Sequence, residues 1–133
     1  MRRQFRLPSE DESYLDAVGL AWETLSEGGS KWLLIHEAPV PGGYNANHVI
    51  EAYLIDPNYP DTQIDMVYFH PGLSRSDGKS IGAAECLIPL DGKTFQRWSR
   101  HRTPANQWRR GVDDISTHRT LVQHWLEREF TIR

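Results

Sequence analysis

Proline- and glycine-rich breaks divide most of this chain into short apolar segments, and their spacing limits the folds that are open to it. The breaks lie at Gly28-Gly29, at 39–43, at 56–61 and at His70-Pro71-Gly72. Proline donates no hydrogen bond to a strand neighbour, and glycine, asparagine and aspartate favour turns, so these stretches end any regular element. The apolar segments between them, 31–36, 48–55 and 64–69, have strand length. The pattern predicts a meander of short antiparallel strands.

A second hairpin is indicated further along the chain. Residues 73–85 carry no regular pattern and predict an irregular loop, and residues 86–90 then form a short extended piece. Asp91-Gly92 is a strong two-residue hairpin signal that leads into an extended segment at 93–98. The sheet is therefore expected to hold three to four main strands.

Two helices are expected, one near each end of the chain. Ser9 and Glu12 have the spacing of a capping box, and apolar residues then recur at 14, 15, 18, 21, 22 and 25, which predicts a helix up to Gly28. Asp113 or Asp114 can cap a last helix with an apolar side made of Ile115, His118, Leu121, Val122, Trp125 and Leu126. The prediction is an α+β fold with both helices on one face of an antiparallel sheet, in one domain over residues 1–133.

Composition excludes several classes of protein. The 133-residue chain has a net charge of -3, which argues against a general nucleic-acid binder. It has no apolar run long enough for a membrane span and no apolar stretch at its N-terminus, so we expect a cytoplasmic protein that does not enter membranes. A single cysteine and scattered histidines give no ligand spacing typical of zinc, and neither a metal nor another cofactor is expected.

The single cysteine, Cys86, cannot form an intramolecular disulfide. It is either a buried small hydrophobe or a working thiol. Gly82, Ala83 and Ala84 precede it, and their small side chains leave room for a bulky acyl group to approach the sulfur. This local sequence favours the working thiol.

Charge is distributed unevenly along the chain. Acidic residues cluster in the first helix, whereas Arg97, Arg100, Arg102, Arg109 and Arg110 crowd into one later segment. Two interpretations stay open: two solvated faces of opposite sign, or two surfaces that dock partners. The turn at Asp91-Gly92 would fold the segment with His101 back along Cys86, which makes His101 a candidate polar partner of the thiol.

Several motifs occur in the order found in ubiquitin-conjugating (E2) enzymes. They are Tyr59-Pro60, Phe69-His70-Pro71, the run Cys86-Leu87-Ile88-Pro89-Leu90, and Trp108 followed by a helix. The whole chain resembles the E2 fold, and the segments 97–102 and Leu7-Pro8 resemble prokaryotic E2 family E more narrowly. Two features depart from the E2 pattern: Gly72 replaces an asparagine, and Cys86 follows His70 at a longer spacing.

The resemblance implies an enzyme that accepts the C-terminus of a ubiquitin-like protein from an E1-like enzyme as a thioester on Cys86 and passes it to an amine. His101 would orient the thioester or carry a proton, and His70 would shape the loop or assist catalysis. Expected partners are the E1-like enzyme, the ubiquitin-like protein and a JAB-type deubiquitinase of the same pathway. Glu10, Asp11 and Glu12 would dock the E1-like enzyme, and Arg97, Arg100 and Arg102 would form a second partner-binding surface.

Two alternatives remain. The chain could be a non-catalytic E2-variant or RWD-like module that only binds a ubiquitin-like protein or an E1-like enzyme, in which case Cys86 would be buried and inert. It could also be an unrelated α+β adaptor in which the order of motifs is a coincidence. Gene context in similar systems indicates antiviral defence, and the sequence leaves the role of the pathway open.

Overall fold

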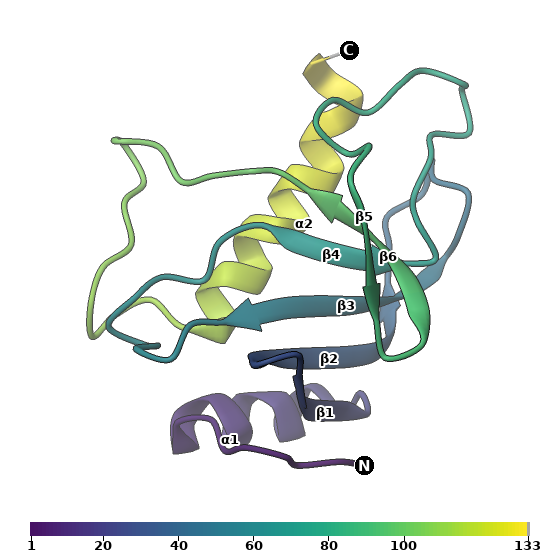
Figure 1. Ribbon diagram of the computed structural model, residues 1–133. Helices are drawn as coiled ribbons and strands as arrows, with labels where there is room; N and C mark the ends of the chain where they lie inside the picture. The colour runs from purple at the N-terminus through teal and green to yellow at the C-terminus, as the bar shows by residue number, and fades with distance from the viewer. Residues whose placement is uncertain (133) are drawn as a thin grey trace.

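The computed structural model, which describes residues 1–132, is an α+β fold built on one curled antiparallel sheet (Figure 1). Its six strands lie in the order β1-β2-β3-β4-β6-β5. The elements are, in chain order, α1 (Ser9–Val18), β1 (Trp22–Glu27), β2 (Ser30–Pro39), β3 (His48–Ile55), β4 (Val67–His70), β5 (Leu87–Leu90), β6 (Lys93–Trp98) and α2 (Ile115–Ile132).

Both helices pack on one face of the sheet, as predicted. Leu15 of α1 and the α2 residues Val122 and Leu126 belong to one buried cluster with Tyr53 and Trp98 of the sheet. In Figure 1 the long helix α2 crosses behind the strands, and α1 lies next to β1. The predicted apolar side of the last helix is confirmed, because five of its six residues are buried, namely Ile115, His118, Val122, Trp125 and Leu126.

The other face of the sheet is covered by the curl of the sheet itself. A second buried cluster holds Leu34 and Ala52 from the middle strands together with Tyr68, Leu90 and Phe95 from the strands that fold over them. In Figure 1 the strand β5 passes in front of the rest of the sheet. The sheet therefore encloses a small core of its own on the side away from α2.

Ionic contacts hold the curl at one end. The β5–β6 turn is the predicted one: Asp91 and Gly92 both have positive φ, 52° and 74°, as a two-residue type I′ hairpin requires. The Asp91 carboxylate accepts hydrogen bonds from Arg2, whose guanidinium also bonds Glu23 of β1. The Asp91 backbone N–H donates to the Glu27 carboxylate over 3.1 Å. The turn of the last hairpin is thus fastened to the first strand.

The prediction for the first helix is wrong in length and in its cap. The helix begins at Ser9 as expected, but it ends at Val18, because Gly19 adopts the left-handed conformation with φ of 82°. Pro8 is the N-cap, and no side chain caps the helix. Glu12 instead accepts the Leu7 N–H over 3.0 Å. Residues 22–27, predicted to be helical, form β1 and bring an additional strand into the sheet.

The third predicted strand is shifted. Residues 64–69 were expected to be extended, but β4 spans Val67–His70, because Met66 has a φ of 60° that interrupts the strand. With β1 and the complete β5–β6 hairpin, the sheet has six strands instead of the three to four expected. The predicted strand at 48–55 matches β3 at both ends. Neither helix among residues 1–132 is long and apolar enough to cross a membrane.

Candidate functional site

Cys86 lies immediately before β5, at the end of the hairpin that is remote from the fastened turn. The cysteine is free and partly exposed. Its carbonyl oxygen accepts the backbone N–H of Arg97 over 2.8 Å, so the backbone at the thiol is held against β6. The loop before it is also tied down, because Ser99 N–H donates to the Ala83 carbonyl over 2.9 Å. The thiol is therefore presented from a fixed backbone at an edge of the sheet.

The groups that share the face of Cys86 come from β4 and β6. Tyr68 of β4 pairs with Arg97 of β6, and Arg97 bonds the backbone of Cys86, so the three residues lie in one row across three strands. Burial raises the pKa of Tyr68 above its usual value; Arg97 lowers it, and Cys86 and Asp65 raise it. These four side chains therefore act on one another electrostatically.

Arg97 contributes a cation that no carboxylate neutralises directly within residues 1–132. Its Nε donates to the Ser99 hydroxyl oxygen over 3.1 Å, and it forms no ion pair with a described residue. A positive charge near a reacting sulfur can stabilise negative charge that develops during acyl transfer. The row of Tyr68, Arg97 and Cys86 is the arrangement in this molecule that can support nucleophilic chemistry at the sulfur.

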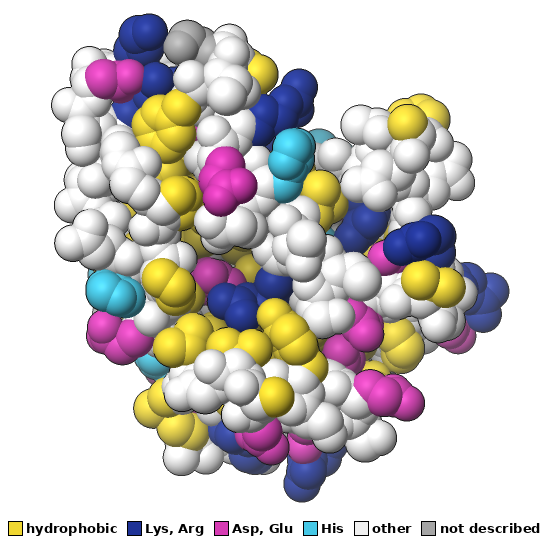
Figure 2. Space-filling view, turned by 180° about the vertical axis from the view of Figure 1, so that it is seen from behind, with side chains coloured by type: hydrophobic (Ala, Val, Ile, Leu, Met, Phe, Trp, Pro, Cys, Tyr) yellow, Lys and Arg dark blue, Asp and Glu magenta, His cyan; other side chains and the backbone are white. Residues whose placement is uncertain are grey.

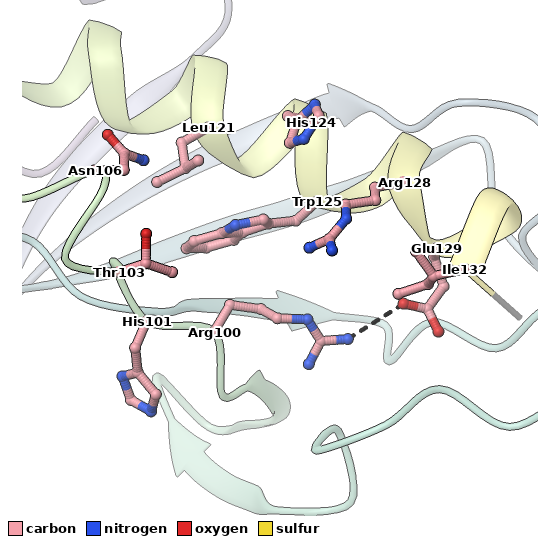
Figure 3. A pocket seen from close by; sticks show the side chains of 10 residues that line it. All are labelled: Arg100, His101, Thr103, Asn106, Leu121, His124, Trp125, Arg128, Glu129 and Ile132. Carbon is pink, nitrogen blue, oxygen red and sulfur yellow. Dashed lines mark hydrogen bonds and ion pairs between the residues drawn. The ribbon is translucent and has the colours of Figure 1, made fainter.

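His101 lies within hydrogen-bonding distance of Asp65. The ring Nδ1 lies 3.0 Å from an Asp65 carboxylate oxygen, and the histidine side chain is 62% exposed. In Figure 3 the ring points away from the side chains of α2, whereas Arg100 points toward them. His101 is thus joined to the neighbourhood of Cys86 through Asp65, which also acts on Tyr68. A solvent-exposed histidine oriented by a carboxylate can accept and release protons.

His70 is held in the structure by its neighbours. Its Nδ1 lies 2.8 Å from the Thr94 carbonyl oxygen, and its ring packs on Phe95 at 5.5 Å between centroids. These contacts join the end of β4 to β6. Of the two roles expected for His70, shaping the loop or assisting catalysis, these contacts fit the first.

Gln96 lies against the position where Gly72 replaces an asparagine. A Cβ added at Gly72 would lie 3.4 Å from the Cβ of Gln96. The Gln96 carbonyl accepts the Leu73 N–H over 2.8 Å and the Trp98 indole N–H over 3.0 Å, and its NH₂ donates to the Leu73 carbonyl over 3.0 Å. Gln96 therefore anchors the start of the 73–85 loop to β6.

The acidic residues of α1 differ in how they are placed. Glu10 is exposed, and Glu12 pairs with Arg6. Asp11 is only 2% exposed: its carboxylate accepts the Tyr59 hydroxyl over 2.6 Å and the Ile115 N–H over 3.2 Å. The expectation that Asp11 offers charge to a partner is corrected by this burial, because the carboxylate instead joins α1 to the start of α2.

The three arginines predicted to bind a partner are also placed differently. Arg97 is partly exposed beside Cys86, and Arg100 pairs with the buried Glu129 at 3.3 Å. The Arg102 side chain is only 6% exposed and stacks on Trp108, 4.9 Å from the ring centroid. Arg102 is therefore a mostly buried cation, and its part in binding a partner stays a prediction.

Sequence reasoning missed Tyr68, Asp65 and Gln96. Each was part of a segment interpreted as strand or loop, and their relation to Cys86 arises from strand register, which one sequence does not reveal.

Within residues 1–132 no three His, Cys, Asp or Glu side chains are grouped so that they could hold a metal ion.

The model of the family described as Prokaryotic E2 family E matches residues 7–129, which is most of the chain. No curated protein and no solved structure matches it.

Proposed function

This chain belongs to prokaryotic E2 family E, and from that membership we propose that it is an E2-like conjugating enzyme with Cys86 as its nucleophile. The family match indicates an E2-like role in general, with an E1-like enzyme and a ubiquitin-like protein as the kinds of partner. The assignment of the thioester to Cys86, and the steps below, are our proposal.

One observation carries the proposal: the sulfur-bearing residue is partly exposed at a sheet edge. A carrier thiol has to be reached by a peptide tail, and a cysteine kept only for packing is usually buried. The adjacent Arg97 supports the same conclusion, because a cation on this row would stabilise negative charge that develops as the thioester reacts. Leu87, the next residue, is 62% exposed, so the edge strand is open to solvent at this point.

The reaction would take place in two acyl transfers. In the first, the Cys86 thiolate attacks the carbonyl carbon of the thioester on the E1-like enzyme; a new carbon–sulfur bond forms, and the E1 sulfur leaves. In the second, an amine attacks the Cys86 thioester, a carbon–nitrogen bond forms, and the Cys86 sulfur leaves. The proton lost by the amine would pass to His101, held by Asp65.

Tyr68 is our candidate for stabilising the oxyanion of these steps. The asparagine position is occupied by Gly72, and the nearby Gln96 amide is engaged with Leu73 and Trp98. Tyr68 carries a hydroxyl on the same face as Cys86, and burial keeps it protonated. A neutral phenol can donate a hydrogen bond to a developing negative charge.

A working thiol needs reducing surroundings, so we propose a cytoplasmic pathway. The partners would be an E1-like enzyme and a ubiquitin-like protein, together with a JAB-type deubiquitinase that reverses the modification. Glu10 of α1, which is exposed, is the acidic group that we retain for docking the E1-like enzyme.

The test is a charging assay with a purified E1-like enzyme, its ubiquitin-like protein and ATP. We expect an adduct on a non-reducing gel that thiols remove. Cys86→Ser should lose this adduct or replace it with a thiol-resistant ester, whereas Ser80→Ala in the same loop should charge normally. An adduct unchanged in Cys86→Ser, or none with wild type and an active E1-like enzyme, would support the non-catalytic binding module instead.

A further inference from the structure

A continuous groove runs between α2 and the segment that follows β6, on the molecule's far side in Figure 1. It consists of two adjoining hollows of about 280 and 460 Å³ that share Asn106, Leu121 and His124. Figure 2 shows this side, where the surface is hollowed between two raised parts and basic and histidine side chains lie on the walls. Among the described residues, Cys86 lines neither hollow. We name this feature the basic groove.

The walls of the basic groove carry more positive than negative charge. Four arginines line it, against two carboxylates, and two histidines complete its ionisable lining: Arg100, Arg102, Arg109, Arg128, Asp113, Glu129, His101 and His124. Four positive and two negative groups leave an excess of two positive charges. The whole chain, in contrast, has a net charge of -3.

The ion pairs inside the basic groove do not provide every arginine with a carboxylate of its own. Asp113 is shared by two arginines, with Arg109 at 3.2 Å and Arg102 at 3.9 Å. Arg128 lines the groove and forms no ion pair with any residue of 1–132. The Asp113 carboxylate is thus shared by two guanidinium groups at one end of the groove, and Arg128 lies at the other end without an ion pair among the described residues.

Arg102 gives the second, independent indication of a ligand. Its side chain is 6% exposed, and its Nε is buried without a hydrogen-bond partner in the described part of the chain. Its hydrogen bond to His118 is long: a terminal guanidinium nitrogen of Arg102 lies 3.4 Å from Nδ1 of His118. Leaving a buried charged group short of hydrogen bonds is costly, so negative charge at this wall would stabilise the Arg102 guanidinium electrostatically.

The shape of the basic groove fits an extended chain. It follows α2 from Thr117 to Ile132, a rise of about 22 Å at about 1.5 Å per residue. About six or seven residues of extended peptide cover that length. Trp125 and Leu121 form part of the lining between the charged walls, so apolar side chains of a peptide would also find contacts (Figure 3).

We propose that the basic groove binds an extended acidic peptide segment of a partner protein. The carboxylates would pair with Arg128 at one end and with Arg109 and the Arg102 wall at the other. The inference goes beyond the proposed function, since it concerns a surface separate from the thiol.

The experiment is an NMR titration of the ¹⁵N-labelled full chain with a blocked peptide of about six glutamates, matched by the same peptide of glutamines. We expect saturable shifts of the Arg102 Nε–H resonance and of α2 amides with the glutamate peptide alone. Arg128→Gln should weaken binding about two- to fivefold, which corresponds to one exposed charge pair, and Arg109→Gln/Arg128→Gln should weaken it further. Arg110→Gln, which makes the same charge change outside the groove, should leave affinity within about twofold.

Three results would overturn the proposal. One is equal binding of the glutamine peptide, and another is an equal loss of affinity in Arg110→Gln and Arg128→Gln. The third is saturation of the same Arg102 shift by inorganic phosphate at the same concentration, which would replace the peptide by a small anion. Because the readout does not involve Cys86, each of these results can be distinguished from a failure of the charging assay.

Discussion

Arg97 donates its backbone N–H to the carbonyl oxygen of Cys86 over 2.8 Å. This bond ties the only cysteine of the chain to a strand whose Arg97 side chain forms no ion pair among residues 1–132. The same bond aligns both residues with Tyr68 on β4. Local backbone pairing thereby assembles a thiol, a cation and a phenol from three separate parts of the sequence.

The reactivity of Cys86 should depend on Arg97. Replacing it with glutamine removes a partly exposed positive charge near the sulfur, so alkylation by iodoacetamide at neutral pH should slow about two- to fivefold. Arg97→Lys keeps the charge and should react nearly as wild type does. The rate of thiol loss measures both, with Arg110→Gln as the control for overall charge. Equal rates in Arg97→Gln and wild type would remove Arg97 from the account.

Gln96 should contribute more to the free energy of unfolding than Asn45, an exposed amide that bonds the same loop. Gln96→Leu leaves the Leu73 N–H and the Trp98 indole N–H without their acceptor, which should cost about 2 to 4 kcal/mol in the free energy of unfolding. Asn45 also bonds the loop, to Gly72 and Ser74, but it is exposed, so Asn45→Ala should cost only about 1 kcal/mol. Urea denaturation distinguishes the two, and similar costs would contradict the anchoring role of Gln96.

His118 should make stability depend on pH. Burial lowers its pKa from 6.5 to about 4, so the folded protein holds the neutral ring while the unfolded chain takes up a proton below pH 6.5. The stability from this group is complete above pH 6.5 and is lost as the pH falls toward 4. The loss amounts to about 2 to 3 kcal/mol between pH 7.5 and 4.5.

His118→Gln isolates this effect, because glutamine does not titrate and its amide can still donate to the Met66 carbonyl. Between pH 7.5 and 4.5 the free energy of unfolding should decrease by about 2 to 3 kcal/mol more in wild type than in the variant. The carboxylates titrate alike in both proteins and cancel in the comparison. Parallel pH profiles would show that the neutral ring is not the cause.

Two adjacent glycines provide a matched pair for packing at the end of α2. A Cβ at Gly43 would lie 2.6 Å from Phe130, and its φ of 106° disfavours any side chain, whereas a Cβ at Gly42 would meet nothing within 4 Å. Gly43→Ala should therefore lower the free energy of unfolding by about 1 to 3 kcal/mol. Gly42→Ala should change it by less than about 0.5 kcal/mol. Thermal and urea unfolding of both variants check the difference.

The parts of the fold that local signals determine were predictable. The turn chemistry of Asp91-Gly92 and the alternation in 48–55 led to the observed hairpin and to β3. The first helix was extended too far because Trp22 and Leu25 match a helical spacing equally well. They belong instead to a strand buried on both sides, with Trp22 in one core cluster and Leu25 in the other. Gly19 was the stop signal, and the longer apolar pattern outweighed it.

The site was predictable only in part. Cys86 and His101 could be selected by residue chemistry, but Tyr68 and Asp65 become their neighbours through pairing between β4 and β6 and through the interruption at Met66. Likewise, the acidic run around Asp11 predicts an exposed carboxylate. The packing of α1 on the start of α2 buries it. Such relations depend on non-local contacts, which residue patterns do not specify.

The most direct measurement is the intact mass of the protein after incubation with the E1-like enzyme, ATP and the ubiquitin-like protein, followed by mapping of the modified peptide. We expect a mass equal to the two proteins less one water, sensitive to thiols, with the modification at Cys86. An adduct on any other residue, or an unmodified Cys86 while the E1-like enzyme itself is charged, would contradict it.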